Sequence, residues 1–131
     1  MTPMTAREGG EVAVRAIRGA IQVGDNTREE VLDGATELVL EVLHRNGVAP
    51  DDLISILFTA TPDLTAEFPA YAARQLGLTD VPLMCASEID VPGAMPRTLR
   101  LLAHVNTDRP RSDIRHVYLR GAAALRTDLP Q

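Results

Sequence analysis

The chain has 131 residues and a mass of 14.2 kDa, which is the size of one ordinary domain. Apolar residues make up 45% and charged residues 24%, and this balance excludes an intrinsically disordered chain. No apolar run approaches the roughly 20 residues of a membrane span, and the opening MTPMTAREGGEVAV lacks the apolar core of a secretory signal. A single cysteine excludes an internal disulfide, so we expect a cytoplasmic protein.

Charge and aromatic content narrow the expected partners. The formal net charge is -5, no basic stripe is present, and tryptophan is absent, so neither nucleic acid nor a membrane surface is an expected partner. All 13 basic residues are arginine. A GC-rich genome explains this bias more simply than anion recognition does, so function has to be argued from where the arginines stand.

The first predicted elements are a leader, a strand and a turn. Residues 1–11 are polar and contain two adjacent glycines, which predicts a flexible leader. Residues 12–23 alternate and are rich in β-branched side chains, as expected of a strand. The Gly-Asp-Asn sequence at 24–26 predicts a turn.

A helix is predicted over residues 28–45. Thr27 precedes it, and Glu30 stands three residues later, which is the spacing of a capping box. Gly47 predicts where it ends. The apolar face is formed by residues that recur at helical spacing: Val31, Ala35, Leu38, Val39, Val42 and Leu43.

The middle of the chain predicts a strand, a helix and a further strand. The run LISILFTA at 53–60 is typical of a buried strand. Pro69 suits the first turn of a helix over 68–76, and Gly77 predicts its end. A short strand is predicted over 81–86.

The last third predicts a loop, a helix and two strands. The loop covers 87–93, strands are predicted at 114–119 and 122–125, and Pro96 is expected to open a third helix. The apolar positions of that helix are Leu99, Leu102, Ala103 and Val105.

These elements predict one α/β (α+β) domain over residues 12–131, built on a mixed five-stranded sheet with three helices. Three helices leave one face of such a sheet hard to cover. We therefore expect self-association.

The sequence contains few familiar catalytic groups. The three histidines, His44, His104 and His116, are isolated and lack a second ligand at metal-binding spacing, so no metal site is predicted. No phosphate-binding glycine loop is present. Cys85 and His116 could meet in space as a nucleophile pair, but a lone buried cysteine is more often a small hydrophobic residue.

The arginine positions indicate an anion site. Arg18 lies in the first predicted strand, Arg74 and Arg100 on predicted helices, and Arg126 after the last apolar run. Each one taken alone is more simply a solvated surface residue. If they converge with Glu88, they fit a ligand that carries more than one carboxylate.

The ordered set of short motifs resembles the AroH-type chorismate mutases. The match extends over about residues 12–129, nearly the whole chain. The motifs are RAIRGA at 15–20, TATPDL at 59–64, FPA at 68–70 with Arg74, VPLMC at 81–85, EIDV at 88–91, Arg100, IRHVYL at 114–119 and Leu-Arg at 125–126.

This resemblance implies a homotrimer that forms a pseudo-α/β barrel, with active sites in clefts between subunits and no cofactor. The implied reaction is the rearrangement of chorismate to prephenate in phenylalanine and tyrosine biosynthesis. The implied pocket takes Arg18, Cys85, Glu88, Arg100 and Tyr118 from one subunit, Phe68, Ala70 and Arg74 from its neighbour, Leu83 and Met84 as wall, and Leu125 and Arg126 from a closing tail.

The resemblance also implies roles for four catalytic residues. Arg100 donates to the ether oxygen that gains charge as the C–O bond opens. Arg18 contacts a carboxylate and the same oxygen region, while Glu88 and Cys85 hold the ring hydroxyl. The alternative from another class is a non-catalytic trimeric module that binds or senses a small carboxylate. Such a module needs no donor at an ether oxygen.

Two positions depart from the family pattern. Tyr71 stands where relatives carry lysine, which removes one peripheral cation. Met84 stands where relatives carry a smaller polar residue, which changes a wall contact.

Overall fold

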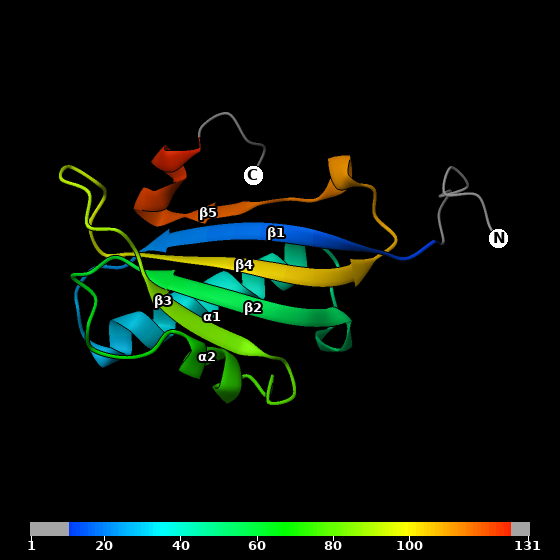
Figure 1. Cartoon of the computed structure of the whole chain (residues 1–131), viewed down its shortest axis with the longest axis horizontal. Helices are drawn as coiled ribbons and strands as arrows, with labels where there is room; N and C mark the ends of the chain where they lie inside the picture. The colour runs from blue at the N-terminus through cyan, green and yellow to red at the C-terminus, as the bar shows by residue number, and fades with distance from the viewer. Residues whose placement is uncertain (1–10, 127–131) are drawn as a thin grey trace.

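The computed structural model describes residues 11–126 and consists of one five-stranded sheet with two α-helices on one of its faces (Figure 1). Except for Glu11, the leader predicted at 1–11 lies outside the described residues. The elements are β1 (Ala13–Gln22), α1 (Arg28–Arg45), β2 (Leu53–Ala60), α2 (Ala70–Gln75), β3 (Leu83–Ser87), β4 (Thr98–Thr107) and β5 (Val117–Leu119), with short 3-10 helices η1 (Pro50–Asp52), η2 (Arg111–Asp113) and η3 (Arg120–Leu125).

The strand order is β3-β2-β4-β1-β5, so β4 is central. It pairs antiparallel with β1 on one side and with β2 on the other, and its Leu101 is in register with both Gly19 and Phe58. The outer strands β3 and β5 run parallel to β2 and β1, respectively. The predicted mixed sheet of five strands is confirmed.

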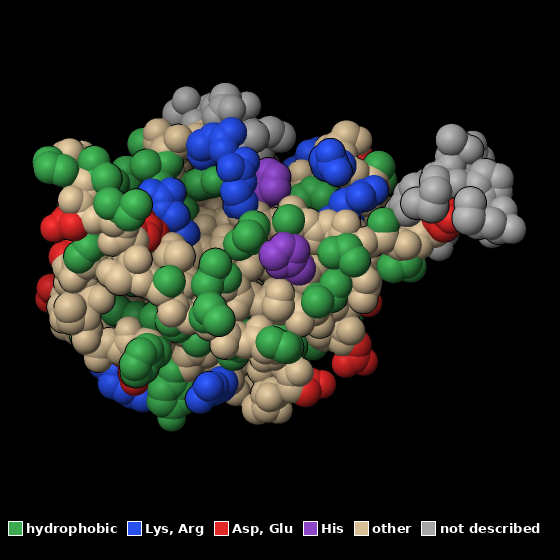
Figure 2. All heavy atoms as spheres, viewed as in Figure 1, with side chains coloured by type: hydrophobic (Ala, Val, Ile, Leu, Met, Phe, Trp, Pro, Cys, Tyr) green, Lys and Arg blue, Asp and Glu red, His purple; other side chains and the backbone are tan. Residues whose placement is uncertain are grey.

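The two faces of the sheet differ in burial. Ile17, Phe58 and Leu101 are almost fully buried on the face that α1 and α2 cover. Their neighbours along each strand point to the opposite face, which we call the open face. It carries exposed apolar side chains, including Val14 and Met84. Figure 2 views this face and shows hydrophobic side chains spread across the sheet, with a group of arginines beside β5 and η3.

Helix α1 has the bounds that its sequence predicts. The Thr27 hydroxyl accepts a hydrogen bond from the backbone N–H of Glu30 at 3.1 Å, as a helix cap requires. The Glu30 carboxylate does not close a capping box, because it reaches back to the N–H of Gly24 at 2.8 Å. The acid therefore fixes the turn between β1 and α1 as well as the start of the helix.

The end of α1 is a Schellman motif. Gly47 has a φ of 60°, its N–H binds the His44 carbonyl, and the Val48 N–H binds the Leu43 carbonyl at 2.9 Å. The expected role of Gly47 is confirmed.

The predicted third helix is wrong, and the segment is strand β4. Burial alternates along residues 99–105, because the residues at 99, 101, 103 and 105 are buried while Arg100, Leu102 and His104 are only partly buried. The run LRLLAHV has apolar residues at both the helical and the strand spacing. Pairing with two neighbouring strands therefore decides that it forms a strand. Pro96 precedes a turn in which Arg97 has a φ of 51°.

The predicted strand at 122–125 is also wrong. Arg120 has a φ of 53° and turns the chain away from β5, and residues 120–125 form η3. Ala122 is fully buried and packs with Ala20 and Tyr118 in a small second core. The segment is therefore held by the burial of Ala122 rather than by pairing with a strand.

Two other elements are shorter than predicted. Helix α2 begins at Ala70, and β3 begins at Leu83. Within the described range 11–126, no helix is long and apolar enough to span a membrane.

A glycine on α1 sets how closely this helix approaches the sheet. A Cβ at Gly34 would lie 2.5 Å from Cγ1 of Val23, whose branched side chain is stiff. We expect Gly34→Ala to lower the free energy of unfolding by about 1–3 kcal/mol, although alanine gains about 1 kcal/mol in helix propensity. Urea unfolding at fixed protein concentration measures the change.

Asp33→Ala is the matched control, since Asp33 is the exposed neighbour on the same helix. Its free energy of unfolding should stay within about 0.5 kcal/mol of wild type. A Gly34→Ala protein as stable as wild type would contradict the close approach.

Candidate active site

One cavity of about 380 Å³ opens on the open face where β1, β2 and β4 meet β5 and the end of η3. We call it the cationic cavity because three arginines line it. Its lining residues are Arg18, Gly19, Leu57, Thr59, Arg100, Leu101, Leu102, Tyr118 and Arg126.

The sheet register brings these side chains together. Arg100 on β4 is paired with Ala20 on β1, so a small residue leaves room beside the guanidinium. Arg18 lies two residues before Ala20 and points to the same face. Tyr118 is in register with Ala20 from β5 and is 6% exposed, which places its ring beside the two arginines.

Glu88 links the loop after β3 to Arg100. Its Oε2 accepts a hydrogen bond from Arg100 Nε at 3.0 Å and a second from the Thr59 hydroxyl at 2.6 Å. The Glu88 side chain is 19% exposed and the Arg100 side chain 40% exposed. The pair is thus partly shielded from water, and the charge on Arg100 has a fixed counterion.

His116 lies beside the cationic cavity, next to Arg18. The backbone N–H of Arg18 donates to His116 Nδ1 at 2.9 Å, which requires that this nitrogen carry no proton. Burial lowers the pKa of His116 below its ordinary value, and the charges of Arg18 and Arg126 lower it further. His116 is therefore a neutral acceptor at neutral pH.

A second cavity, also of about 380 Å³, lies between α2 and β3. We call it the apolar cavity. Its lining residues are Phe68, Ala70, Tyr71, Arg74, Leu83, Met84 and Cys85.

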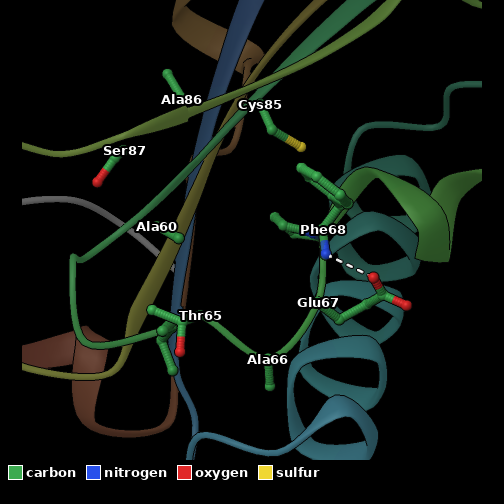
Figure 3. A pocket seen from close by; sticks show the side chains of 10 residues that line it. Ala60, Thr65, Ala66, Glu67, Phe68, Cys85, Ala86 and Ser87 are labelled. Atoms are coloured by element: carbon green, nitrogen blue, oxygen red, sulfur yellow. Dashed lines mark hydrogen bonds between the residues drawn. The ribbon is translucent and has the colours of Figure 1, made fainter.

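Cys85 is the chemically distinctive group at the apolar cavity. Figure 3 shows its thiol pointing toward Phe68 across an adjoining pocket. Burial raises the pKa of the Cys85 thiol, although the nearby Arg74 charge opposes the shift. The thiol therefore keeps its proton at neutral pH and can donate a hydrogen bond.

The residues predicted for the site thus fall into two groups. Arg18, Arg100, Tyr118 and Arg126 line the cationic cavity, and Glu88 joins them through Arg100. The second group lines the apolar cavity and consists of Phe68, Ala70, Arg74, Leu83, Met84 and Cys85. Leu125 packs against the core around Tyr118, and the tail beyond residue 126 lies outside the described residues.

Cys85 belongs to a different group from the one that the resemblance implies. It is in register with Phe58, while Arg100 is in register with Thr59, the next residue of β2. Neighbouring residues of a strand point to opposite faces. Cys85 therefore faces α2, on the side of the sheet away from Arg18 and Arg100.

Sequence reasoning missed two residues of this site, Thr59 and His116. Thr59 belongs to the TATPDL motif, and the alternation of β2 would have placed it on the open face. The sequence presents His116 only as a candidate metal ligand or partner of a nucleophile. Within residues 11–126, no three His, Cys, Asp or Glu side chains lie close enough together to hold a metal.

Tyr71, which departs from the family pattern, makes an aromatic contact with a cation. The Arg28 guanidinium lies 5.4 Å from the centre of the Tyr71 ring and also pairs with Glu67 at 3.0 Å. A cation from α1 therefore lies next to α2 at the edge of the apolar cavity.

The lowered pKa of His116 predicts a pH-dependent stability. The unfolded chain takes up the proton near the ordinary value of 6.5, before the folded chain does. We expect stability to be full above that pH and to fall as pH drops through the window below it. The measurement is the free energy of unfolding between pH 8 and 5 at fixed protein concentration.

His116→Asn is the matched control, because its amide oxygen can accept the Arg18 N–H but does not titrate. The other histidines contribute equally to both proteins. Wild type should therefore lose stability relative to the variant below pH 6.5. Parallel stability curves would contradict the assignment.

Comparison with known proteins identifies the family. Residues 14–129 match the family described as chorismate mutase type I. The chain is 50% identical over 117 residues to the chorismate mutase AroH of Thermus thermophilus, covering 88% of this chain and 96% of that protein. It is 43% identical over 117 residues to the AroH protein of Bacillus subtilis, covering 88% and 92%. A solved chorismate mutase from Clostridium thermocellum is 51% identical and superimposes with a TM-score of 0.83, covering 84% of this chain and 98% of that one. The chain belongs to the type I chorismate mutase family.

Proposed function

We propose that this protein converts chorismate to prephenate in active sites that neighbouring subunits of a homotrimer share. The observation that carries the proposal is the convergence of three arginines, Tyr118 and Glu88 at one cavity in a member of this family. A non-catalytic carboxylate-binding role is disfavoured, because every relative described above is a chorismate mutase.

The reaction explains why no acid–base pair or nucleophile is needed. Chorismate rearranges in one unimolecular step, in which a C–O bond breaks as a C–C bond forms. No proton or electron is exchanged with the protein, so the proposed mechanism uses no cofactor. The protein has to hold the side chain over the ring and stabilise charge that grows on the ether oxygen.

Arg100 is the proposed donor to that oxygen. Its bond to Glu88 uses Nε, and so Nη1 and Nη2 are not needed for it and can donate to substrate. Because Glu88 already orients the guanidinium, little reorganisation is needed when charge develops. An arginine keeps its charge in such a site, where a lysine loses it more readily.

The remaining residues bind the rest of the dianion. Arg18 and Arg126 are suited to its two carboxylates, and Tyr118 adds a hydrogen bond beside them. Glu88 and the protonated thiol of Cys85 are suited to the ring hydroxyl. The Glu88 carboxylate also balances positive charge on the ring as the C–O bond opens.

The opposite directions of Cys85 and Arg100 support a shared site. A single small substrate cannot reach both side chains of one subunit, since the sheet separates them. If an apolar cavity lies against the cationic cavity of a neighbour, Cys85, Phe68 and Arg74 close the site from across the interface. Trimer formation would also cover the apolar side chains of the open face, such as Val14 and Met84.

Mixing two inactive variants tests the shared site. Arg74→Ala damages one half and Arg100→Ala the other. In randomly mixed trimers, about a quarter of the sites combine two intact halves. We expect co-refolded variants to regain about that share of wild-type kcat, followed by the loss of chorismate absorbance in the ultraviolet.

The control is each variant refolded alone, which should stay at its own low rate. Light scattering should give the mass of a trimer for every sample. No gain of activity on mixing, or a fully active monomer, would contradict a site shared between subunits.

A neutral copy of arginine tests the role of charge at position 100. Citrulline keeps the shape and the Nε–H that binds Glu88 but removes the positive charge. We expect Arg100→citrulline to lose at least about 10²-fold in kcat while still binding substrate. Arg100→Lys should recover little, since a point charge does not reproduce the planar fork.

Arg45→citrulline is the matched control, because Arg45 lies on α1 and pairs with Glu41 away from both cavities. It should keep wild-type kcat and KM. A folded, trimeric Arg100→citrulline protein with near wild-type kcat would mean that charge at this position does not lower the barrier.

A further inference from the structure

Thr59 and Arg100 both hold Glu88 from within the sheet, and Thr59 is the uncharged one of the two donors. It lies on β2, lines the cationic cavity, and donates its hydroxyl to Glu88 Oε2 at 2.6 Å. A hydroxyl bound to an ionised carboxylate at this length is a strong, charge-assisted hydrogen bond.

The geometry explains why Glu88 needs such a support. It follows the last residue of β3 and lies in the long connection to β4, so its side chain starts from a loop. Its backbone N–H binds the Ala60 carbonyl at 2.9 Å, which fixes the start of the side chain but not the carboxylate. The carboxylate is positioned by the two donors on Oε2, from Thr59 and Arg100.

Thr59 and Arg100 are well placed to act as a pair. They are in direct register on β2 and β4, so the sheet fixes the distance between their backbones. Threonine is β-branched and stiff about its first torsion, so its hydroxyl has few alternative positions. Arg100 is long and flexible, so the rigid donor is Thr59.

We infer that Thr59 is a positioning residue, which locks the Glu88 carboxylate and through it aims the Arg100 guanidinium. This inference rests on the proposed function. Because both donors bind Oε2, the other oxygen, Oε1, is left to accept from a substrate hydroxyl. Because the Arg100 bond uses Nε, both terminal nitrogens of the guanidinium are left for the ether oxygen and a carboxylate. Thr59 itself needs no contact with substrate.

Two substitutions separate the hydroxyl from the shape of Thr59. Thr59→Val keeps the branched shape and removes the donor, and Thr59→Ser keeps the donor. We expect Thr59→Val to lower kcat by about 10- to 100-fold, the usual cost of losing a hydrogen bond to a charged group or misplacing a reacting group. KM should change less, because the lost alignment matters most in the transition state. Thr59→Ser should recover most of kcat.

Thr107→Val is the matched control. Thr107 is at the far end of β4, where its hydroxyl accepts the N–H of Arg109 outside both cavities. Removing this hydroxyl should leave kcat and KM at wild-type values. Circular dichroism and trimer mass establish that each variant is folded and assembled.

A second readout does not depend on activity. In nitrogen-15-labelled protein, the Nε–H resonance of Arg100 is assigned by its loss in Arg100→Lys. We expect this resonance to be sharp in wild type and Thr59→Ser, and broadened or shifted in Thr59→Val, where Glu88 is released.

The two readouts distinguish failure of this inference from failure of the proposed function. A wild-type protein that does not consume chorismate would refute the function, and the Arg100 resonance would still decide the role of Thr59. An unchanged Arg100 resonance in Thr59→Val would overturn the inference. So would wild-type kcat in Thr59→Val, or a Thr59→Ser protein as slow as Thr59→Val.

Discussion

The double pairing of β4 determines what the sheet buries and what it presents. Antiparallel partners on both sides leave this strand no freedom of register, so its alternate residues enter the core with Leu101 among them. The same alternation puts Arg100 on the opposite face. A slip of one residue would bury a guanidinium under α1 and expose the core residues, at a cost that folding could not sustain. The register of β4 therefore fixes both the residues of the hydrophobic core and the position of Arg100.

Local signals in the sequence predict some elements fully. Helix α1 has its cap at Thr27, a helical apolar face and a terminating Gly47, and its predicted bounds are those of the structure. Strand β2 is a continuous apolar run with predicted bounds that are also right. The run at 98–107 carries both periods, and only its two partner strands decide between helix and strand. The apolar run at 122–125 wrongly predicts a strand, because its apolar content says nothing about the turn at Arg120.

For the candidate site too, local motifs predict part of the arrangement, and contacts between distant segments decide the rest. The family motifs contain every side chain predicted for the pocket, but they do not say which face of the sheet each one takes. That depends on the register of β2, which sends Cys85 and Arg100 to opposite sides. Thr59 and His116 were missed for a related reason. Their partners lie 29 and 98 residues away in the chain, so no spacing in the sequence connects them.

The electrostatics of the cationic cavity follow from this arrangement. A chain of net charge -5 gathers three arginines at one cavity, and the fixed carboxylate of Glu88 reduces their mutual repulsion. His116 beside Arg18 stays neutral, since its protonation would add a like charge and break its bond to the Arg18 backbone. Among the described residues, the lining of the cavity is rich in positive charge, and Glu88 orients Arg100 before a ligand arrives. In the proposed reaction, this positive charge would bind the dianion, and charge that develops on its ether oxygen would meet an Arg100 donor that Glu88 already orients. Rigid β-strands hold Arg18, Thr59 and Arg100, so the alignment is set by the same backbone pairing that forms the core.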